Sequence, residues 1–188
     1  MRHQGTVKIE TERLTLRRFT LEDAPAAFRN WESDQRVTKF LTWSHYTALE
    51  DTRKGLAKWV DSYQKPDFYQ WAIVPKDGRD EPVGSISAVE IHEKTKEVEI
   101  GYCIGVDWWG KGIMTEAFRG IIPFFFEQVG ARRICARHDP ENPASGRVME
   151  KCGLQYEGTL RQADYNNRGI VDVAVWGLLA SEYQADKK

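Results

Sequence analysis

The sequence predicts an α/β fold around a mixed sheet, and three observations lead to this prediction. Several segments alternate apolar and polar residues with the period of two that β-strands have. Other segments repeat apolar residues at the spacing of an amphipathic helix. Their order is strand, two helices, three strands with short connections, then helix, strand, helix, strand and strand, which is typical of a mixed sheet with packed helices.

The N-terminal third contains one expected strand and two expected helices. Residues 13–19 alternate apolar and polar side chains and are the strand. Residues 20–23 have a threonine followed three residues later by a carboxylate, a capping pattern that opens a short helix through Phe28 and Trp31. Residues 47–50 repeat that pattern before a longer helix. Its apolar face has residues at helical spacing: Leu49, Leu56, Trp59, Val60 and Tyr63.

The middle of the chain predicts an antiparallel meander of three strands joined by short turns. The strands are residues 69–74, 83–91 and 98–106. A helix is expected from 115 to 129, kinked at Pro123 because proline removes one backbone donor. The remaining elements are a strand, a helix that Gly153 closes, and two strands: residues 132–137, 144–152, 154–160 and 170–179.

Size and charge exclude several classes of function. The 188 residues predict a single domain, residues 1–188. A net charge of -1 supplies no basic field for nucleic acid and no polybasic segment for a membrane surface. The longest apolar run, residues 121–126, is far shorter than the roughly 20 residues that span a bilayer. The N-terminus lacks the apolar core of a signal peptide.

Cysteine and histidine usage predicts a cytoplasmic protein without a metal. The three cysteines are odd in number and far apart in sequence, which favours reduced thiols over a disulfide framework or a zinc site. The four histidines are equally scattered, so no metal-ligand spacing occurs.

Two glycines between a strand and a helix predict an anion site. A strand that ends at Val106 is followed by Gly110 and Gly112, and then by a helix whose first turn includes Thr115. The first N–H groups of a helix have no internal partner, and the helix dipole adds positive partial charge there. Glycine lets a phosphate approach those amides closely. A plain strand–turn–helix connection is the alternative interpretation.

A nucleoside triphosphate is a poorer match to this loop. Residues 105–112 follow the pattern G-x-x-x-x-G-K of a P-loop. However, Gly112 stands where the serine or threonine that holds Mg²⁺ would be. The pattern therefore favours a diphosphate bound by amides alone.

Four stretches resemble the GNAT superfamily of N-acetyltransferases, and within it the Rim-type branch of ribosomal-protein N-terminal acetyltransferases. They occur in the family's order and are similar to its opening strand, its central strand, its pyrophosphate loop and its second cofactor motif: residues 11–19, 98–104, 109–117 and 142–154. The resemblance covers nearly the whole chain. It implies a single domain with a largely antiparallel mixed sheet, helices on both faces, and acetyl-CoA as cosubstrate.

The resemblance also implies which residues bind acetyl-CoA. They are the end of the central strand, the glycine loop, the first turn of the next helix and the second motif: Ile104, Gly105, Val106, Trp109, Gly110, Lys111, Gly112, Ile113, Met114, Thr115, Asn142 and Ser145. Trp109 departs from the usual glutamine or arginine and is expected to pack rather than donate a hydrogen bond. Met114 also departs from the family pattern but retains its backbone N–H.

Three chemical tasks follow from acetyl transfer to an amine. The resemblance implies that a backbone N–H near residues 103–105 stabilises the oxyanion. Many relatives carry a tyrosine where Met149 stands, so Ser145 is the candidate donor to the departing thiolate; a serine that bonds local backbone is the alternative. Asn142 is expected to bond the pantetheine arm or to cap the helix.

The third task is removal of a proton from the amine. Glu97 and Glu99 point to one face of the central strand, and either is a candidate base acting through a water. The alternative is a strand glutamate paired with a cation. His138, Glu141 and Tyr165 are further candidates for the same cleft.

The acceptor itself is left open by the sequence. The resemblance implies that the aromatic segment 40–46 walls the acceptor side, with Trp43, His45 and Tyr46 as substrate-binding candidates. A peptide N-terminus, a polyamine, an amino acid or a drug amine would suit it. A catalytically idle CoA-binding regulatory module is a further alternative, because Met149 supplies no hydroxyl. A monomer or homodimer is expected, without nucleic acid or membrane.

Overall fold

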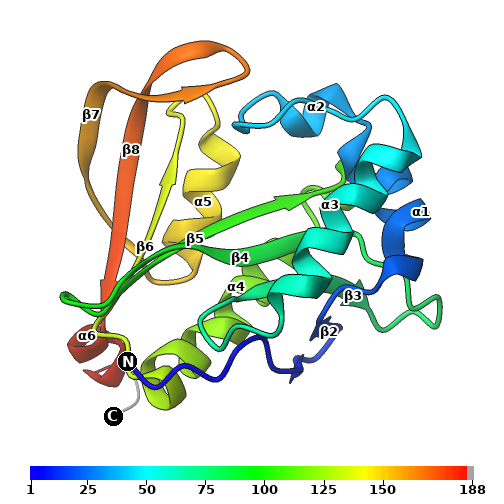
Figure 1. Ribbon diagram of the computed structural model, residues 1–188. Coiled ribbons are helices and arrows are strands. Elements are labelled where there is room, and N and C mark those ends of the chain that lie inside the picture. Colours follow the sequence, from blue (N-terminus) through cyan, green and yellow to red (C-terminus); the bar gives the residue numbers. More distant parts are fainter. Residues whose placement is uncertain (186–188) are drawn as a thin grey trace.

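The computed structural model describes residues 1–185; residues 186–188, the end of the predicted domain, lie outside it. Within that range eight strands form one sheet in the order β1-β2-β3-β4-β5-β6-β8-β7 (Figure 1). Neighbouring strands pair antiparallel except β5 and β6, which pair parallel. The predicted mixed, largely antiparallel sheet is confirmed.

The strands are β1 (Ile9–Glu10), β2 (Leu14–Arg17), β3 (Gln70–Pro75), β4 (Gly84–His92), β5 (Glu97–Ile104), β6 (Arg133–His138), β7 (Gln155–Asn166) and β8 (Gly169–Leu179). The α-helices are α1 (Ala24–Ala27), α2 (Gln35–Thr38), α3 (Leu49–Ser62), α4 (Ile113–Pro123), α5 (Pro143–Lys151) and α6 (Ala180–Ala185). Short 3-10 or π-helical turns are η1 (Leu21–Asp23), η2 (Phe28–Glu32), η3 (Val106–Trp108) and η4 (Phe124–Val129).

Local details differ from the sequence predictions where short-range patterns compete. The capping pattern at residues 47–50 does not cap α3, because Ala48 is the N-cap residue and makes no side-chain bond. The strand expected to reach Val106 ends at Ile104. Pro123 ends α4, and the chain continues as the π-helical turn η4. Gly153 follows α5 with a φ of 87°, as a helix-closing glycine does.

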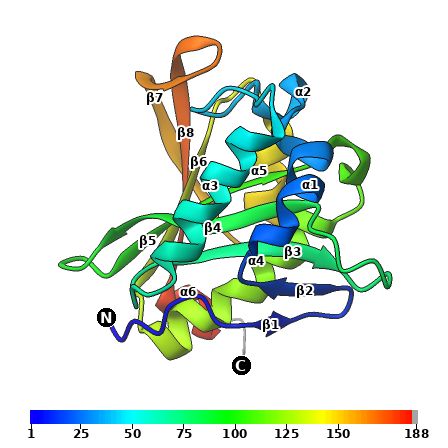
Figure 2. The same cartoon turned by 45° about the vertical axis from the view of Figure 1, so that its right-hand side comes forward.

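Helices cover both faces of the sheet, as predicted. Side chains alternate along β3, so Trp71 and Ile73 pack in the cluster beneath α4, whereas Ala72 and Val74 pack against α1 and α3. Figure 2 shows α1 and α3 in front of the sheet and α4 behind it. The two apolar clusters hold the central strands from both sides.

The parallel pair β5–β6 separates after three residues. Glu97, Val98 and Glu99 are paired with Arg133, Ile134 and Cys135, and β5 then continues to Ile104 without β6 beside it. Meanwhile β6 remains paired with β8 along its whole length, to His138. The two strands therefore diverge, and one edge of β5 is unpaired from residue 100 onward.

A buried carboxyl lies beneath the α1–α3 layer. Glu32, at the end of η2, is 3% exposed, and its Oε2 atom has no hydrogen-bond partner within residues 1–185. Burial raises the pKa of Glu32 from 4.5 to about 7, although the neighbouring Thr52 hydroxyl lowers it in part. The folded protein consequently holds a proton that the unfolded chain releases above pH 4.5.

Glu32 therefore makes the protein less stable as pH rises from about 4.5 to about 7. The Glu32→Gln variant keeps the shape of the side chain but cannot ionise. Its free energy of unfolding should therefore lack the fall of roughly 3 kcal/mol that Glu32 causes in the wild type as pH rises. Urea unfolding at pH 5 and pH 8 measures this difference. The exposed Glu12→Gln variant is the matched control, and an unchanged pH dependence in Glu32→Gln would contradict the assignment.

Candidate active site

A glycine loop joins the end of β5 to α4. After β5 and η3, Gly110 and Gly112 have φ angles of 71° and 73°, in the left-handed region that strains other residues. Gly112 is the N-cap residue of α4, and the first helical bond runs from the Glu116 N–H to the Gly112 carbonyl, 3.0 Å. The two glycines thus turn the chain directly into the helix.

The loop presents a row of free amides. Among residues 1–185, no acceptor bonds the N–H groups of Gly110, Lys111 and Gly112 or those of the first three α4 residues. The dipole of α4 adds positive partial charge at this end. The predicted anion-binding geometry is therefore present, and no charged side chain is needed to form it.

Arg13 of the segment before β2 braces the loop from behind. Its Nη1 donates to the Lys111 carbonyl at 3.1 Å, and its Nε donates to Glu116 in the first turn of α4 at 2.6 Å. Thr11 and the Arg13 backbone N–H also donate to Glu116, each at 2.7 Å. These contacts use the carbonyl side of the loop and leave its amides free.

A cavity of about 360 Å³ lies in front of the loop, between β5 and α5. Nine of the residues predicted to bind a cofactor line it: Ile104, Trp109, Gly110, Gly112, Ile113, Met114, Thr115, Asn142 and Ser145. Gly105, Val106 and Lys111, also predicted, do not line it. The α2 segment supplies two wall residues that the sequence did not indicate, Arg36 and Val37, and the predicted 40–46 segment supplies Phe40 and Leu41.

Trp109 of the loop forms a hydrogen bond with the end of β5. Its indole N–H donates to the Ile104 carbonyl at 2.9 Å, while half of the side chain is exposed. The expectation that Trp109 packs without donating is wrong, because the strand end offers it an unpaired carbonyl.

The open edge of β5 offers one backbone N–H to the cavity near its end. The Gly105 N–H donates to the Val83 carbonyl at 2.9 Å, so it faces β4 and is not free. Backbone groups alternate along a strand, and the Ile104 carbonyl already points to the other edge, toward Trp109. The Ile104 N–H is therefore the donor in the predicted 103–105 segment that faces the cavity.

Close packing explains why Gly101 in β5 and Gly105 just after it carry no side chain. A Cβ on Gly105 would lie 2.2 Å from the Asn30 carbonyl oxygen of η2. A Cβ on Gly101 would lie 2.6 Å from Cγ1 of Val89, the residue at the bulge of β4. A bulge thus occurs in the neighbouring strand, β4, and η2 lies directly against the end of β5.

Ser145 in the first turn of α5 bonds a tyrosine of β5. Its Oγ lies 2.9 Å from Oη of Tyr102, and the Tyr102 hydroxyl also lies 3.1 Å from the Ser145 carbonyl. Tyr102 lines the cavity with Ser145, yet the sequence analysis assigned it no role. The only signal was its place in the run E-I-G-Y. Met149 is 1% exposed and belongs to the core.

Asn142 lies before α5 with a free side chain. It is the N-cap residue of α5 but makes no side-chain cap bond, and it lines the cavity. Of its two predicted roles, the contact with a ligand fits this geometry and the helix cap does not.

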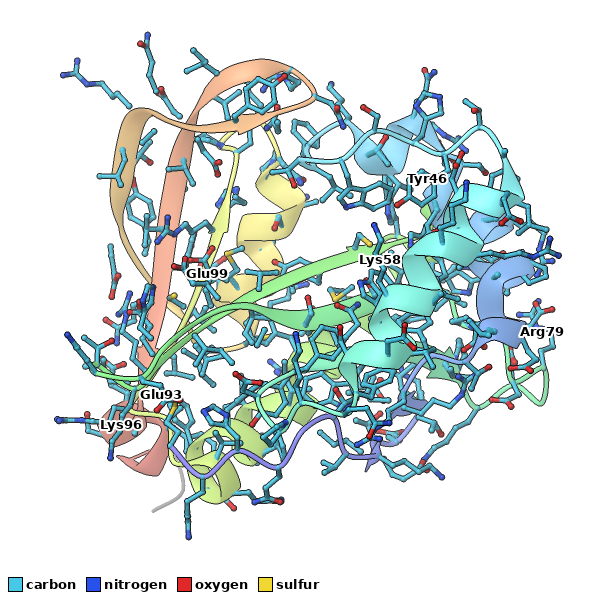
Figure 3. All side chains as sticks on the ribbon, in the orientation of Figure 1. Tyr46, Lys58, Arg79, Glu93, Lys96 and Glu99 are labelled. Atoms are coloured by element: carbon cyan, nitrogen blue, oxygen red, sulfur yellow. The ribbon has the colours of Figure 1, made fainter. Side chains whose placement is uncertain are left out.

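The two candidate bases lie on the face of β5 opposite Tyr102. Glu97 bonds Arg133 at 2.5 Å. Glu99 forms an ion pair with Arg137 at 3.1 Å, and burial raises the pKa of Glu99 although Arg137 lowers it. Figure 3 shows Glu99 beside the diverging strands, below the β7–β8 hairpin. Glu99 is therefore the carboxyl nearer the divergence, and Glu97 is held by Arg133.

The comparisons with known proteins agree with this geometry. Residues 13–155 match the acetyltransferase (GNAT) domain family. The chain belongs to the GNAT family. An N-acetyltransferase named p20 from Bacillus licheniformis is 33% identical over 92% of this chain and 96% of its own. The ribosomal-protein-serine acetyltransferase of Escherichia coli is 30% identical over 72% of this chain and 75% of its own.

A solved structure extends the likeness to the whole GNAT fold. The ribosomal L7/L12 α-N-acetyltransferase RimL, solved with coenzyme A, has a TM-score of 0.82 and 23% identity, covering 94% of this chain and 99% of that one. The predictions of the GNAT fold, the Rim-type branch and an N-acetyltransferase are confirmed. The glycine loop lies within the residues 13–155 that match the family.

The acceptor-side candidates of this GNAT chain lie beside α2 and α3. The rings of Trp43 and Tyr46 are 5.7 Å apart, and Figure 3 shows Tyr46 across the molecule from Glu99. His45 Nε2 lies 3.3 Å from Nε2 of Gln35. None of the three predicted residues lines the cavity, whereas Phe40 of the same segment does. Their substrate-binding roles stay predictions.

The tip of the β7–β8 hairpin lies against this segment (Figure 1). The Asn167 N–H donates to the Leu41 carbonyl at 3.1 Å, and its side-chain amide donates to the carbonyls of Thr38 and Trp43, both at 2.8 Å. Ser44 donates back to the Asn167 side chain at 3.1 Å. We call these contacts the Asn167 bridge; they join the two walls above the diverging strands.

Two further features concern residues 1–185, the part of the chain that the structure describes. No helix there is long and apolar enough to span a bilayer. No group of three or more histidine, cysteine, aspartate or glutamate residues there is arranged to hold a metal ion. All three cysteines are free thiols.

The loop geometry predicts a specific effect of one methyl group. Gly110→Ala and Gly130→Ala both place a side chain at a left-handed φ, 71° and 78°, where no atom lies within 4 Å of the new Cβ. Each should therefore cost about 1–2 kcal/mol of stability. Only Gly110→Ala should also weaken coenzyme A binding, by roughly tenfold, because its methyl group would obstruct the approach of the diphosphate to the loop amides.

Calorimetric titration with coenzyme A measures the affinity of each variant. Thermal unfolding measures the loss of stability that both variants should show. Equal affinities in the two variants would show that the diphosphate does not bind at this loop.

Proposed function

We propose that this GNAT protein transfers the acetyl group of acetyl-CoA to the N-terminal α-amine of a protein, with ribosomal proteins as the first acceptors to test. One observation carries the proposal: the row of free amides on the glycine loop opens onto a cavity along the unpaired edge of β5. The chain's similarity to the ribosomal-protein-serine acetyltransferase supports the acceptor class. Such an acceptor implies a cytoplasmic reaction by a monomer or homodimer.

The residues around the cavity fit acetyl-CoA without a metal ion. The amides of residues 110–115 would bind the diphosphate, and the free side chain of Asn142 would bond the pantetheine arm. The Ile104 N–H lies on the unpaired edge, where it would stabilise the oxyanion that forms on the thioester carbonyl. The side chains of Lys111 and Val106 do not line the cavity, so these residues would act only through their backbone.

Glu99 and Ser145 approach the reacting centre from opposite faces of β5. The Glu99 carboxylate, with a pKa raised by burial, would take the amine proton through a water molecule. The nitrogen then attacks the thioester carbon and loses its second proton to solvent water, and the C–S bond breaks with its electron pair left on sulfur. Ser145 would donate a hydrogen bond to that sulfur.

Amine chemistry supports an α-amine as the acceptor. At pH 7 roughly a tenth of α-amines with a pKa near 8 are neutral, but well under a thousandth of lysines with a pKa near 10.4.

Two alternative functions are acetylation of a small-molecule amine and binding of CoA without catalysis. Measurements of thermal stability with added ligands, and of the CoA thiol released during turnover, distinguish them. Acetyl-CoA at a hundredfold excess over its Kd should add about 2.7 kcal/mol to stability, and Mg-ATP should add none. Thiol release should then be fastest with ribosomal-protein N-terminal peptides, ahead of polyamines, amino acids and drug amines.

Either of two results would overturn the proposal. Stabilisation by Mg-ATP alone would indicate a nucleotide site instead. Tight acetyl-CoA binding with no acetylation of any amine in the panel would indicate the idle module. Mass spectrometry of the peptides identifies the acetylated nitrogen.

The assignment of Glu99 predicts how a variant responds to pH. Glu99→Gln should lower acetylation of an α-amine peptide at pH 7 by about a hundredfold, the usual contribution of a general base. The loss should shrink at pH 9, because the α-amine is then neutral without help. The exposed Glu50→Gln on α3, with the same change of charge, is the control and should stay within twofold of the wild type.

Initial rates across pH 6–10 test this prediction. If Glu99→Gln and the wild type have the same pH profile, Glu99 is not the base.

A further inference from the structure

The thiolate side of the cavity lacks the hydroxyl that many GNAT relatives place one turn into the second motif. Met149 occupies that position, buried in the core, and a thioether donates no hydrogen bond. Ser145 remains as a donor on α5. A lone serine hydroxyl is free to rotate, so something has to direct its proton toward the sulfur.

The neighbouring strand supplies a second hydroxyl. Oη of Tyr102 lies 2.9 Å from Oγ of Ser145, and both residues line the cavity. The Tyr102 ring packs against Phe118 of α4 with ring centroids 5.7 Å apart. The hydroxyl of Tyr102 is therefore held between β5, α4 and α5, on the cavity side of the sheet.

We propose that Tyr102 is a positioning residue that donates its O–H to Ser145 Oγ, so that the Ser145 O–H points at the sulfur of coenzyme A. This inference rests on the proposed function of the site. Tyr102 thereby takes over part of the task of the tyrosine that Met149 replaces, from a different element of the fold.

The hydrogen bonds of the site permit this arrangement. The Tyr102 hydroxyl has one proton and two acceptors within reach, the Ser145 carbonyl at 3.1 Å and Ser145 Oγ at 2.9 Å. The carbonyl lies inside α5, where the N–H four residues later bonds it. If the Tyr102 hydroxyl donates to Ser145 Oγ, the Ser145 carbonyl therefore still has a hydrogen-bond partner within the helix. It also frees the serine proton to point into the cavity.

The pair stabilises the leaving group without giving up a proton. The N–C bond forms, the C–S bond breaks, and the electron pair stays on sulfur, while the proton of the amine leaves through Glu99. Burial raises the pKa of Tyr102 well above its usual value, so the hydroxyl stays protonated beside a thiolate. Donation of Tyr102 to Ser145 polarises the serine hydroxyl, which strengthens its bond to the negative sulfur.

A double-mutant cycle tests the coupling between the two hydroxyls. Ser145→Ala should lower kcat by roughly thirtyfold, as loss of a hydrogen bond to a charge does, and Tyr102→Phe by about fivefold. In the Ser145→Ala background, Tyr102→Phe should have no further effect, because Tyr102 acts only through the serine. Coenzyme A affinity should change little in either variant.

Tyr63→Phe is the matched control. Its hydroxyl is also hydrogen-bonded, to the Phe19 N–H and the Gln70 carbonyl, and Tyr63 does not line the cavity. This variant should lose stability but keep its kcat, which separates a loss of packing from a loss of the hydroxyl pair.

A second measurement does not depend on turnover. The ultraviolet absorbance of the thiolate follows ionisation of the thiol of bound coenzyme A during a pH titration. The thiol should ionise at lower pH in the wild type and Tyr63→Phe than in Tyr102→Phe, and at the highest pH in Ser145→Ala.

Two results would overturn the inference. One is a Tyr102→Phe variant whose kcat and thiol titration equal those of the wild type. The other is a double variant whose loss is the product of the two single losses, since Tyr102 would then act independently of Ser145. If the wild type acetylates no amine, the proposed function fails, while the thiol titration still decides the role of Tyr102.

Discussion

Parallel pairing between β5 and β6 lasts for three residue pairs, and the site depends on its early end. If the pairing continued, β6 would occupy the edge of β5 and no cavity would form along it. Instead, β6 follows β8 while β5 stays with β4. The divergence exposes backbone groups of a central strand, which a folded sheet otherwise pairs. One of them, the Ile104 carbonyl, is used at once by Trp109.

The loop that follows β5 presents its free amides through backbone shape rather than through a charged side chain. Left-handed glycines, the helix dipole and a brace on the carbonyl side together direct the amides one way. The carboxylate of Glu116 sits near this end of α4, but Arg13 bonds it, which limits its repulsion of a diphosphate. A protein with a net charge of -1 can thus bind a strongly anionic cosubstrate.

Strand alternation separates the two kinds of chemistry. Along β5, Cys103 packs in the cluster of the α1–α3 layer, and Glu99 lies on the same face of the strand, where it pairs with Arg137. Tyr102 and Ile104 lie on the other face, in the cluster that includes α4 and α5. The proposed base and the proposed hydroxyl donors therefore lie on opposite faces of the strand. The Asn167 bridge joins segments that are more than a hundred residues apart in the sequence.

The sequence by itself determined the features that depend on neighbouring residues: the meander, the glycine loop and the closing Gly153. It placed the starts of α4 and α5 within two residues. Periodicity, left-handed glycines and helix ends are local properties, so local patterns indicate them. Together with the family motifs, they also located most of the cavity wall.

Only the tertiary structure decided which side chains meet. The pairing of Tyr102 with Ser145, the bond from Trp109 to Ile104, the Asn167 bridge and the ion pair that holds Glu97 all join segments whose approach no local pattern encodes. The short β1 and α2 likewise form through packing rather than propensity. The physical reason is that periodicity places a side chain on a face, whereas its partner depends on how distant elements pack.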